Sequence, residues 1–392
     1  MFPSIVASGM RGEAFDPLSL FASGERGFHL GCVHESVLKN QSAITGSDLL
    51  SGGTWSVNYP DRVTITGSGT IEFHDEVGDA EVLVVTSVDT EEDTTYMLQF
   101  EAIHSSGSFQ VMIGSTSIAT IDGSETTYLP FVASSGSSTV ISINCTGGTC
   151  LFSGVQVHEM QLTGLNLFQD ADGRMPATRA GNSIGGVRDQ SPNGNNFQQN
   201  FPASGASLAT DGSRYYIHNS SIASNTSMRS INDVDLDVEG VTACVAFSHG
   251  FPLQSGNTVA SIFNFGQPGL DPGFGFKYGE TSEVWSSGSV LSAVDYVTPL
   301  DESPHVFTLE ASIPDDLLEA TFDSLPNESS VDDQGAGTFG SRVFYIGPQS
   351  GLSERFLGRM YTLPTVVGRR LSTQELSNLR RWHQHRTQPS LL

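Results

Sequence analysis

Short apolar runs separated by turn residues extend along most of this 392-residue chain. Runs of Val, Ile, Phe and Tyr, each a few residues long, alternate with Ser, Thr and Asn, and the chain contains 42 glycines. This pattern is typical of many short strands joined by tight turns. Helical periodicity is almost absent. We therefore expect an all-β protein with two tandem antiparallel β-sandwiches of the jelly-roll type.

The first sandwich is expected between residues 40 and 162. Seven segments in this region show the alternation of half-buried strands, with turn residues between them. They cover residues 63–73, 80–87, 96–103, 109–114, 127–133, 139–145 and 151–158. Strands of this length and number close readily into a compact domain of two sheets.

The order of features in this region resembles the family 4/9 carbohydrate-binding modules. Trp55 comes first, in a setting typical of an exposed aromatic residue. Three segments follow it: TYMLQFEAIHSSGSFQVMIG, TTYLPFVASSGSSTVISI and the closing LFSGVQVHEM. The resemblance is one of pattern, and it implies a β-sandwich with a sugar-binding surface.

The second sandwich is expected between residues 163 and 392. The segments LFQDADGRMPATRAGNSIGGVRDQSPNGNN (167–196) and DDQGAGTFGSRVFYIGPQSGLSERFLGRMYTL (332–363) carry its signature. They resemble the opening and closing strands of a concanavalin-like (laminin-G-like) sandwich that recurs in virion structural proteins of tailed bacteriophages. The sequence departs from the family at residues 192–194, where Pro-Asn-Gly replaces the usual turn. The resemblance implies a binding surface on a particle.

Residues 1–39 are expected to form an irregular N-terminal arm. The segment FDPLSLFASGERGFHL (15–30) is rich in apolar residues without a run of strands to support them. The phage family places a similar lead-in directly before its LFQD segment, so the simplest account is that the first sandwich is a module inserted between the two. Apolar side chains in such an arm must be covered by another surface. Two readings stay open: the arm folds back on its own domains, or it docks on a neighbouring virion subunit through Phe15, Leu18, Phe21 and Phe28.

One helix is expected, at the C-terminus. Ser372 and Glu375 have the spacing of a capping box, and Leu371 can pack on Leu376 as a hydrophobic staple. Arg380, Arg381 and Arg386 then lie toward the negative end of the helix dipole.

The charge of the chain is strongly acidic, with 43 Asp and Glu against 18 Lys and Arg and a formal net charge of -25. Nucleic-acid binding requires clustered cations that release counterions, so we expect no nucleic-acid partner. The N-terminal residues lack the basic and apolar regions of a signal peptide, and no apolar stretch reaches membrane-spanning length. We expect no membrane insertion, and synthesis in a host bacterial cytoplasm before incorporation into a virion.

Aromatic side chains are the best candidates for carbohydrate binding, because sugar rings stack their apolar faces on Trp and Tyr. Six of these residues lie among Gly, Ser or Asn, as residues in binding loops do. They are Trp55, Tyr59, Tyr215, Tyr216, Tyr278 and Trp285. For each residue taken alone, packing in the core or at a sheet edge is the competing interpretation.

Asp170 and Asp172 are the candidate calcium ligands, with Asp189 and Asp211 as further carboxylates, because some laminin-G-like domains hold calcium at a loop rim. The sequence Asp-Ala-Asp-Gly is also typical of a tight turn, in which Asp side chains hydrogen-bond to nearby backbone N–H groups. No other cofactor is expected. Cys145 and Cys150 have a hairpin-like spacing that fits either a local disulfide or two reduced thiols.

No motif selects a catalytic site. Glycosidases need two carboxylates at a fixed separation, and the sequence singles out no pair; the segments that begin at Gly52 and Gly205 do not match the G-x-S-x-G pattern of a nucleophile elbow. We therefore expect no enzyme. The sequence favours a virion surface protein, a tail fibre or head spike, that attaches to host surface polysaccharide and assembles with other virion subunits.

Two alternatives stay open. One is a structural connector or capsid-decoration protein that does not bind sugar, and the other is a polysaccharide depolymerase. A homo-oligomer is expected, and a trimer is one candidate state because fibres and spikes are frequently trimeric.

Overall fold

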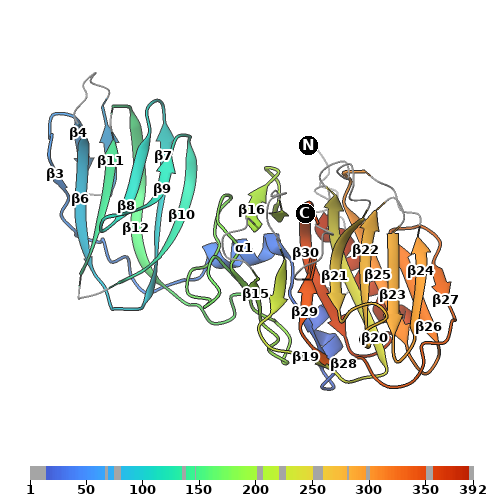
Figure 1. Cartoon of the computed structure of the whole chain (residues 1–392). Helices are drawn as coiled ribbons and strands as arrows, with labels where there is room; N and C mark the ends of the chain where they lie inside the picture. The colour runs from blue at the N-terminus through green and yellow to red at the C-terminus, as the bar shows by residue number, and fades with distance from the viewer. Residues whose placement is uncertain are drawn as a thin grey trace, which may run out of the picture. The chain divides into compact units, whose positions relative to one another are not determined.

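The computed structural model describes residues 15–66, 69–74, 81–134, 138–145, 147–200, 206–219, 227–249, 259–279, 282–296, 301–349 and 356–387. The chain divides by spatial contact into two compact units. The first-sandwich unit comprises residues 33–188 and 202–218, and the second-sandwich unit comprises residues 1–32, 189–201 and 219–392. Almost all regular elements are antiparallel strands (Figure 1), so the all-β fold class is confirmed. The division of the sequence into modules 1–39, 40–162 and 163–392 stays a prediction.

Two antiparallel sheets form the first sandwich. The strand order of one sheet is β10-β7-β12-β5-β4, with β2 pairing β12, and the order of the other is β3-β6-β11-β8-β9. The strands are β2 (Ile44–Thr45), β3 (Ser56–Val57), β4 (Val63–Thr66), β5 (Thr70–Phe73), β6 (Val82–Asp89), β7 (Thr95–His104), β8 (Phe109–Ile113), β9 (Thr116–Ile121), β10 (Glu125–Val132), β11 (Ser138–Cys145) and β12 (Cys150–Met160). Alternate residues point inward, and Phe73, Phe109 and Phe152 pack edge to face in the core.

The predicted strand 63–73 is in fact the hairpin β4–β5. Val63 pairs with Phe73 and Ile65 pairs with Ile71, so the chain reverses between the two strands. Gly69 has a φ of +72°, a conformation that an L side chain rarely adopts. Strand β9 was not predicted, because its sequence TSIATI has only two large apolar residues.

Short elements complete the first-sandwich unit: α1 (Val33–Gln41), β13 (Leu167–Phe168), β14 (Gly186–Val187), β16 (Ala206–Thr210) and β17 (Tyr215–Asn219). Asn40 of α1 is fully buried, and its Nδ2 donates to the carbonyls of Leu167 (2.7 Å) and Ala177 (2.8 Å). Phe168, Met97 and Met160 form a small apolar cluster with Leu165. The LFQD segment thereby covers part of the outer face of the sheet that contains β7 and β12.

The second sandwich also has two main sheets. Within this unit their strand orders are β30-β20-β25-β26-β27, with β1 pairing β30, and β15-β18-β29-β21-β22-β23-β24; β19 and β28 form a separate pair. The strands are β1 (Gly27–His29), β15 (Phe197–Gln199), β18 (Met228–Ser230), β19 (Val234–Leu236), β20 (Gly240–His249), β21 (Val259–Phe265), β22 (Gly273–Gly279), β23 (Ser282–Ser287), β24 (Leu291–Tyr296), β25 (His305–Ser312), β26 (Leu317–Phe322), β27 (Glu328–Ser330), β28 (Gly340–Arg342), β29 (Phe344–Ile346) and β30 (Gly358–Val367). Its core is rich in aromatic rings, including the stacked pair Phe276 and Phe307.

The C-terminal helix α2 (Thr373–Thr387) confirms the prediction from the capping box. The Ser372 N–H donates to Glu375 Oε2 (2.8 Å), and the Glu375 N–H donates to Ser372 Oγ (3.3 Å). Leu371 and Leu379 are buried with residues of β20, β25 and β30. The helix thus covers the face of one sheet that points away from the aromatic core.

Residues 15–32 are ordered parts of the second-sandwich unit. The 3-10 helix η1 (Pro17–Phe21) packs beside α2, and β1 pairs with β30 in the register Gly27 to Val367. Residues 1–14 of the predicted arm lie outside the described residues.

A loop at residues 189–195 holds this N-terminal segment in place. The Asp189 carboxylate accepts from the backbone N–H groups of His29 (3.0 Å), Ser191 (2.8 Å) and Asn195 (2.9 Å). Asn193 and Asn195 each donate from Nδ2 to the Gly27 carbonyl, at 3.0 and 2.8 Å. The D-x-S-P-N-G-N sequence (189–195) therefore has a structural role, because it fixes the N-terminal segment through hydrogen bonds.

Among the described residues, no helix is long and apolar enough to cross a membrane.

Candidate carbohydrate-binding site

Trp55 lines a pocket of about 420 Å³ at one edge of the first sandwich. The pocket is also lined by the loop Ser51–Thr54, by Thr66 at the end of β4, and by Gln156 of β12. Trp55 is half-buried, with part of its ring packed against the sandwich core. We name this cavity the Trp55 pocket. It combines an aromatic face with hydroxyl, amide and carboxylate groups, as sugar-binding pockets do.

The loop that carries Trp55 is fixed by Asp48. Its Oδ1 accepts from the N–H groups of Leu50 and Val157, each at 3.0 Å, which ties the loop to β12. The Gly53 N–H donates to the Leu50 carbonyl (2.8 Å), closing a tight turn. The residue before it, Gly52, has a φ of +81°, which favours glycine. Trp55 is therefore held on an ordered loop.

A second pocket, of about 230 Å³, adjoins the Trp55 pocket on the outer face of the same sheet. Tyr128 lines it together with Gln99, Glu101, Thr126 and Ser153, so we name it the Tyr128 pocket. Gln99 donates from Nε2 to Oε1 of Gln156, a residue of the Trp55 pocket, over 2.5 Å. The rims of the two pockets therefore meet at this pair of amides on β7 and β12.

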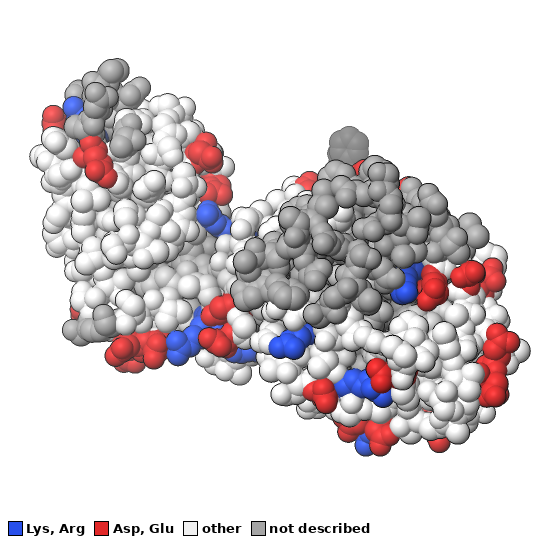
Figure 2. All heavy atoms as spheres, viewed as in Figure 1, with Lys and Arg blue, Asp and Glu red and all other residues white. Residues whose placement is uncertain are grey.

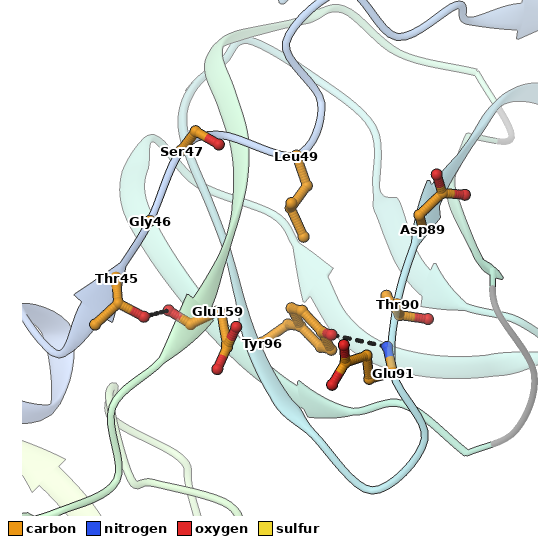
Figure 3. Close-up of a pocket in the computed structure, with 9 residues that line it drawn as sticks. All are labelled: Thr45, Gly46, Ser47, Leu49, Asp89, Thr90, Glu91, Tyr96 and Glu159. Atoms are coloured by element: carbon orange, nitrogen blue, oxygen red, sulfur yellow. Dashed lines mark hydrogen bonds between the residues drawn. The ribbon is translucent and has the colours of Figure 1, made fainter.

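A third pocket, the largest of the three at about 660 Å³, is centred on Tyr96 (Figure 3). The Tyr96 hydroxyl accepts from the Glu91 N–H at 2.8 Å, and the side chains of Glu91 and Glu159 lie on either side of the ring. Asp89 also lines this Tyr96 pocket. Within the part of the chain that the structure describes, no three His, Cys, Asp or Glu side chains are placed to hold a metal ion. Because Tyr96 is buried, this pocket offers little aromatic surface for stacking.

The other predicted aromatic residues are scattered. Tyr59 is exposed, with the Arg62 guanidinium 5.4 Å from its ring centre. Tyr215 stacks on His34 at 5.9 Å, and its neighbour Tyr216 is buried. None of these three lines one of the pockets described above. Of the six residues, Trp55 alone lies in one of these three pockets.

Tyr278 and Trp285 are fully buried in the second sandwich, which corrects their assignment as loop-borne sugar binders. They lie within strands β22 and β23, and Trp285 is opposite Gly275 in the antiparallel register. A Cβ on Gly275 would come within 2.5 Å of Trp285 Nε1. Gly275, one of the neighbouring glycines that favour a loop in the sequence, instead makes room for the indole ring in the core.

The Asp170 side chain stabilises a turn by accepting backbone hydrogen bonds. Its Oδ1 accepts from the N–H groups of Arg174 (3.0 Å) and Met175 (3.2 Å), while Asp172 is exposed. Calcium binding at this turn stays a prediction. Cys145 and Cys150 are buried and are not joined by a disulfide, and burial raises the pKa of the Cys150 thiol to about 12. The Cys150 thiol is therefore protonated at neutral pH.

Two of the predicted docking residues are buried within their own unit. Phe21 packs with the residues under α2, and Phe28 contacts Phe197 and Phe344 at 4.9 and 4.8 Å between ring centres. This burial leaves neither ring available to a neighbouring subunit, which corrects the prediction for these two. Phe15 and Leu18 are half-exposed, and docking through them stays a prediction.

Sequence reasoning missed Tyr128 and Gln156 as members of the site. Both lie on strands whose outward residues carry the pockets, and their partial exposure follows from strand alternation. The available signal was the break in alternation at Ser153-Gly154-Val155, where β12 bulges. A bulge of this kind re-aims side chains and is common next to binding sites.

No known protein family and no curated protein matches the sequence. Among solved structures, the binding domain of botulinum neurotoxin serotype D aligns with 52% of this chain and 49% of its own, at 10% identity and a TM-score of 0.39. The CBM40 of Ruminococcus gnavus IT-sialidase aligns with 37% of this chain and 84% of its own, at 15% identity and a TM-score of 0.29. The CBM22 tandem of Paenibacillus barcinonensis Xyn10C covers 83% of this chain and 97% of its own, at 9% identity and a TM-score of 0.22.

This chain therefore spans about half the length of the neurotoxin domain. The neighbours are carbohydrate-binding and receptor-binding domains. At these TM-scores they carry no weight for ligand or mechanism, and the function is inferred below from the residues of the pockets.

Proposed function

We propose that this protein binds glycans through the Trp55 pocket and, as a virion surface protein of a tailed bacteriophage, attaches the particle to host polysaccharide. The observation that carries the glycan proposal is the position of Trp55 on an ordered loop, facing a cavity with Thr66 and Gln156. The motifs at residues 167–196 and 332–363 support the virion role.

The physical case rests on the pairing of apolar and polar groups. The faces of a pyranose ring are apolar C–H surfaces that stack on an indole, while its hydroxyls need hydrogen-bond partners. Gln156 offers an amide, and Ser51, Thr54 and Thr66 offer hydroxyls around the same cavity. The adjoining Tyr128 pocket adds a second aromatic residue and the Gln99 amide.

The test is binding of the purified protein to intact host cells and to their extracted surface polysaccharide. Trp55→Ala and Gln156→Ala should weaken binding at least about tenfold, which corresponds to about 1.4 kcal/mol. Val140→Ala is the matched control, because Val140 is exposed on the other sheet of the same sandwich. Wild-type binding that Trp55→Ala leaves unchanged would contradict the assignment of the pocket.

The same assay separates the alternatives. Shortened polysaccharide chains in the reaction would indicate a depolymerase, and neither binding nor cleavage would favour a structural connector. Sedimentation of the purified protein tests the proposed homo-oligomer, for which a trimer is one candidate state.

A further inference from the structure

Four aliphatic side chains are exposed at one end of the second sandwich. Leu270 and Val331 are 78% and 76% exposed, and Val290 and Leu291 are 45% and 40% exposed. We name this group the loop-end patch. Single exposed aliphatic residues are common on protein surfaces, but a group of them marks an interaction site.

The loops that carry the patch are bonded to one another. Ser287 Oγ donates to the Asp271 carbonyl (2.9 Å), which joins the β21–β22 turn to the end of β23. The Val290 N–H donates to the Gln334 carbonyl (3.0 Å), and Ser292 Oγ donates to Ser330 Oγ (3.0 Å). Residues 270, 290, 291 and 331 are therefore held on one surface by contacts among three connections.

Gln334 fixes this end of the sandwich. Its side chain is fully buried, and Oε1 accepts from Ser286 Oγ at 2.6 Å. Its N–H donates to Asp316 Oδ1 at 3.0 Å, so the β25–β26 turn joins the same assembly of loops. The patch is therefore preorganised, and a partner that binds it does not have to order these loops.

Carboxylates lie on the connections that carry or adjoin the loop-end patch. Asp315, Asp332 and Asp333 are exposed, and Asp316 is half-exposed. A nearby cation, Arg342, is paired with Asp271 at 3.2 Å. More acidic than basic side chains are also visible over the face drawn in Figure 2, and the whole chain has a formal net charge of -25.

We propose that the loop-end patch docks a polypeptide partner whose aliphatic side chains are flanked by Lys or Arg. The aliphatic side chains supply the apolar contact, and the surrounding carboxylates supply complementary charge that favours encounter and register. A second copy of this chain is disfavoured as the occupant, because the same acidic rims would face each other. This site lies apart in sequence from the pockets, and it does not depend on the proposed glycan binding.

The experiment measures binding of three fluorescent octapeptides to the full-length protein by anisotropy. One peptide alternates Leu with Lys, one alternates Leu with Glu, and one alternates Ser with Lys. The Leu–Lys peptide should bind more tightly than the other two by at least about tenfold. Its affinity should fall at higher salt, since the carboxylate rim contributes.

Variants assign the binding to the patch. The double substitution Leu270→Ser and Val331→Ser should weaken Leu–Lys binding about tenfold or more. Asp332→Asn with Asp333→Asn should reduce its salt dependence. The matched control is Ile103→Ser, which removes a side chain that is 50% exposed on the first sandwich. Since all the substituted side chains are exposed, unchanged thermal unfolding should show that each variant is folded.

Three results would overturn the proposal. The first is Leu–Lys binding that the Leu270→Ser, Val331→Ser variant retains in full. The second is equal binding of the Ser–Lys or Leu–Glu peptide. The third is self-association of the wild type that this variant abolishes, which would identify a second copy as the occupant.

Discussion

The two sandwiches use their aromatic residues in opposite ways. The first sandwich leaves Trp55 and Tyr128 half-exposed at pockets, whereas the second buries Tyr278 and Trp285 completely and exposes aliphatic side chains at its loop end. The same residue type therefore supplies a binding surface in one sandwich and core packing in the other. The difference follows from position within the strand, since Trp55 directly precedes a short edge strand and Trp285 lies inside a paired strand.

Replacing Trp285 with Ala should have the largest effect on stability. Emptying a fully buried site of this size costs about 3–5 kcal/mol, because the surroundings cannot collapse to fill the cavity. Trp55→Ala should cost less than half as much, since its ring is half-buried. Chemical denaturation of the two variants measures both values. Equal losses of stability in the two variants would contradict the conclusion that the two sandwiches use their Trp residues differently.

Acid should weaken the second sandwich through two buried histidines. His29 bonds Thr365 Oγ1 at 2.7 Å, and burial lowers its pKa to about 3. Burial lowers the pKa of His383, which bonds the same hydroxyl and Thr362, well below its usual range. Each is neutral in the folded protein and takes up a proton on unfolding below about pH 6.5, so stability falls as the pH falls below 6.5, by up to about 1.4 kcal/mol per pH unit for each. For His29 this loss continues to about pH 3.

Fluorescence-monitored unfolding at a series of pH values checks this acid dependence. His29→Gln should give a shallower loss of stability between pH 6.5 and 3 than the wild type. An unchanged slope would show that His29 does not contribute.

Gly275→Ala tests whether the core has room for a side chain next to Trp285. The new Cβ would lie 2.5 Å from Trp285 Nε1 and 2.9 Å from Asn264 Oδ1, so overpacking should cost about 1–3 kcal/mol. Gly123→Ala is the control in the first sandwich, because no atom lies within 4 Å of its new Cβ. Thermal unfolding of the two variants compares them. A harmless Gly275→Ala would mean that the indole can shift.

The smallest effect is expected from Glu375→Gln at the start of α2. Hydrogen bonds from Arg369 are the main cause that lowers the pKa of Glu375 to about 2, from an ordinary value of 4.5. Its stabilisation is complete above pH 4.5 and is lost as the pH falls toward 2. The substitution should cost no more than about 1 kcal/mol at pH 7, since the pair is one-third exposed. A difference in stability between the wild type and the variant that persists below pH 2 would contradict the assignment of this stabilisation to the charged Glu375.

The sequence predicted the strand-rich fold and the C-terminal helix because alternation and the Ser372–Glu375 capping box are local signals. It predicted Trp55 as a binding candidate from its polar, glycine-rich neighbours. It could not separate Trp55 from Trp285, because both have such neighbours and only the pairing of Trp285 with Gly275 places the second ring in the core. The Tyr128 pocket could not be predicted from the sequence either, since it depends on the bulge in β12.

The pairing of β1 with β30 constrains how the chain acquires its structure during synthesis. Gly27 to His29 pair with Thr365 to Val367, so more than three hundred residues are made before β1 finds its partner. The strands of the first sandwich all lie between these two segments and can fold as they emerge from the ribosome. The early segment that holds Phe28 therefore stays without its β30 partner until residues 365–367 have been made, although its contacts with residues 189–197 can form earlier.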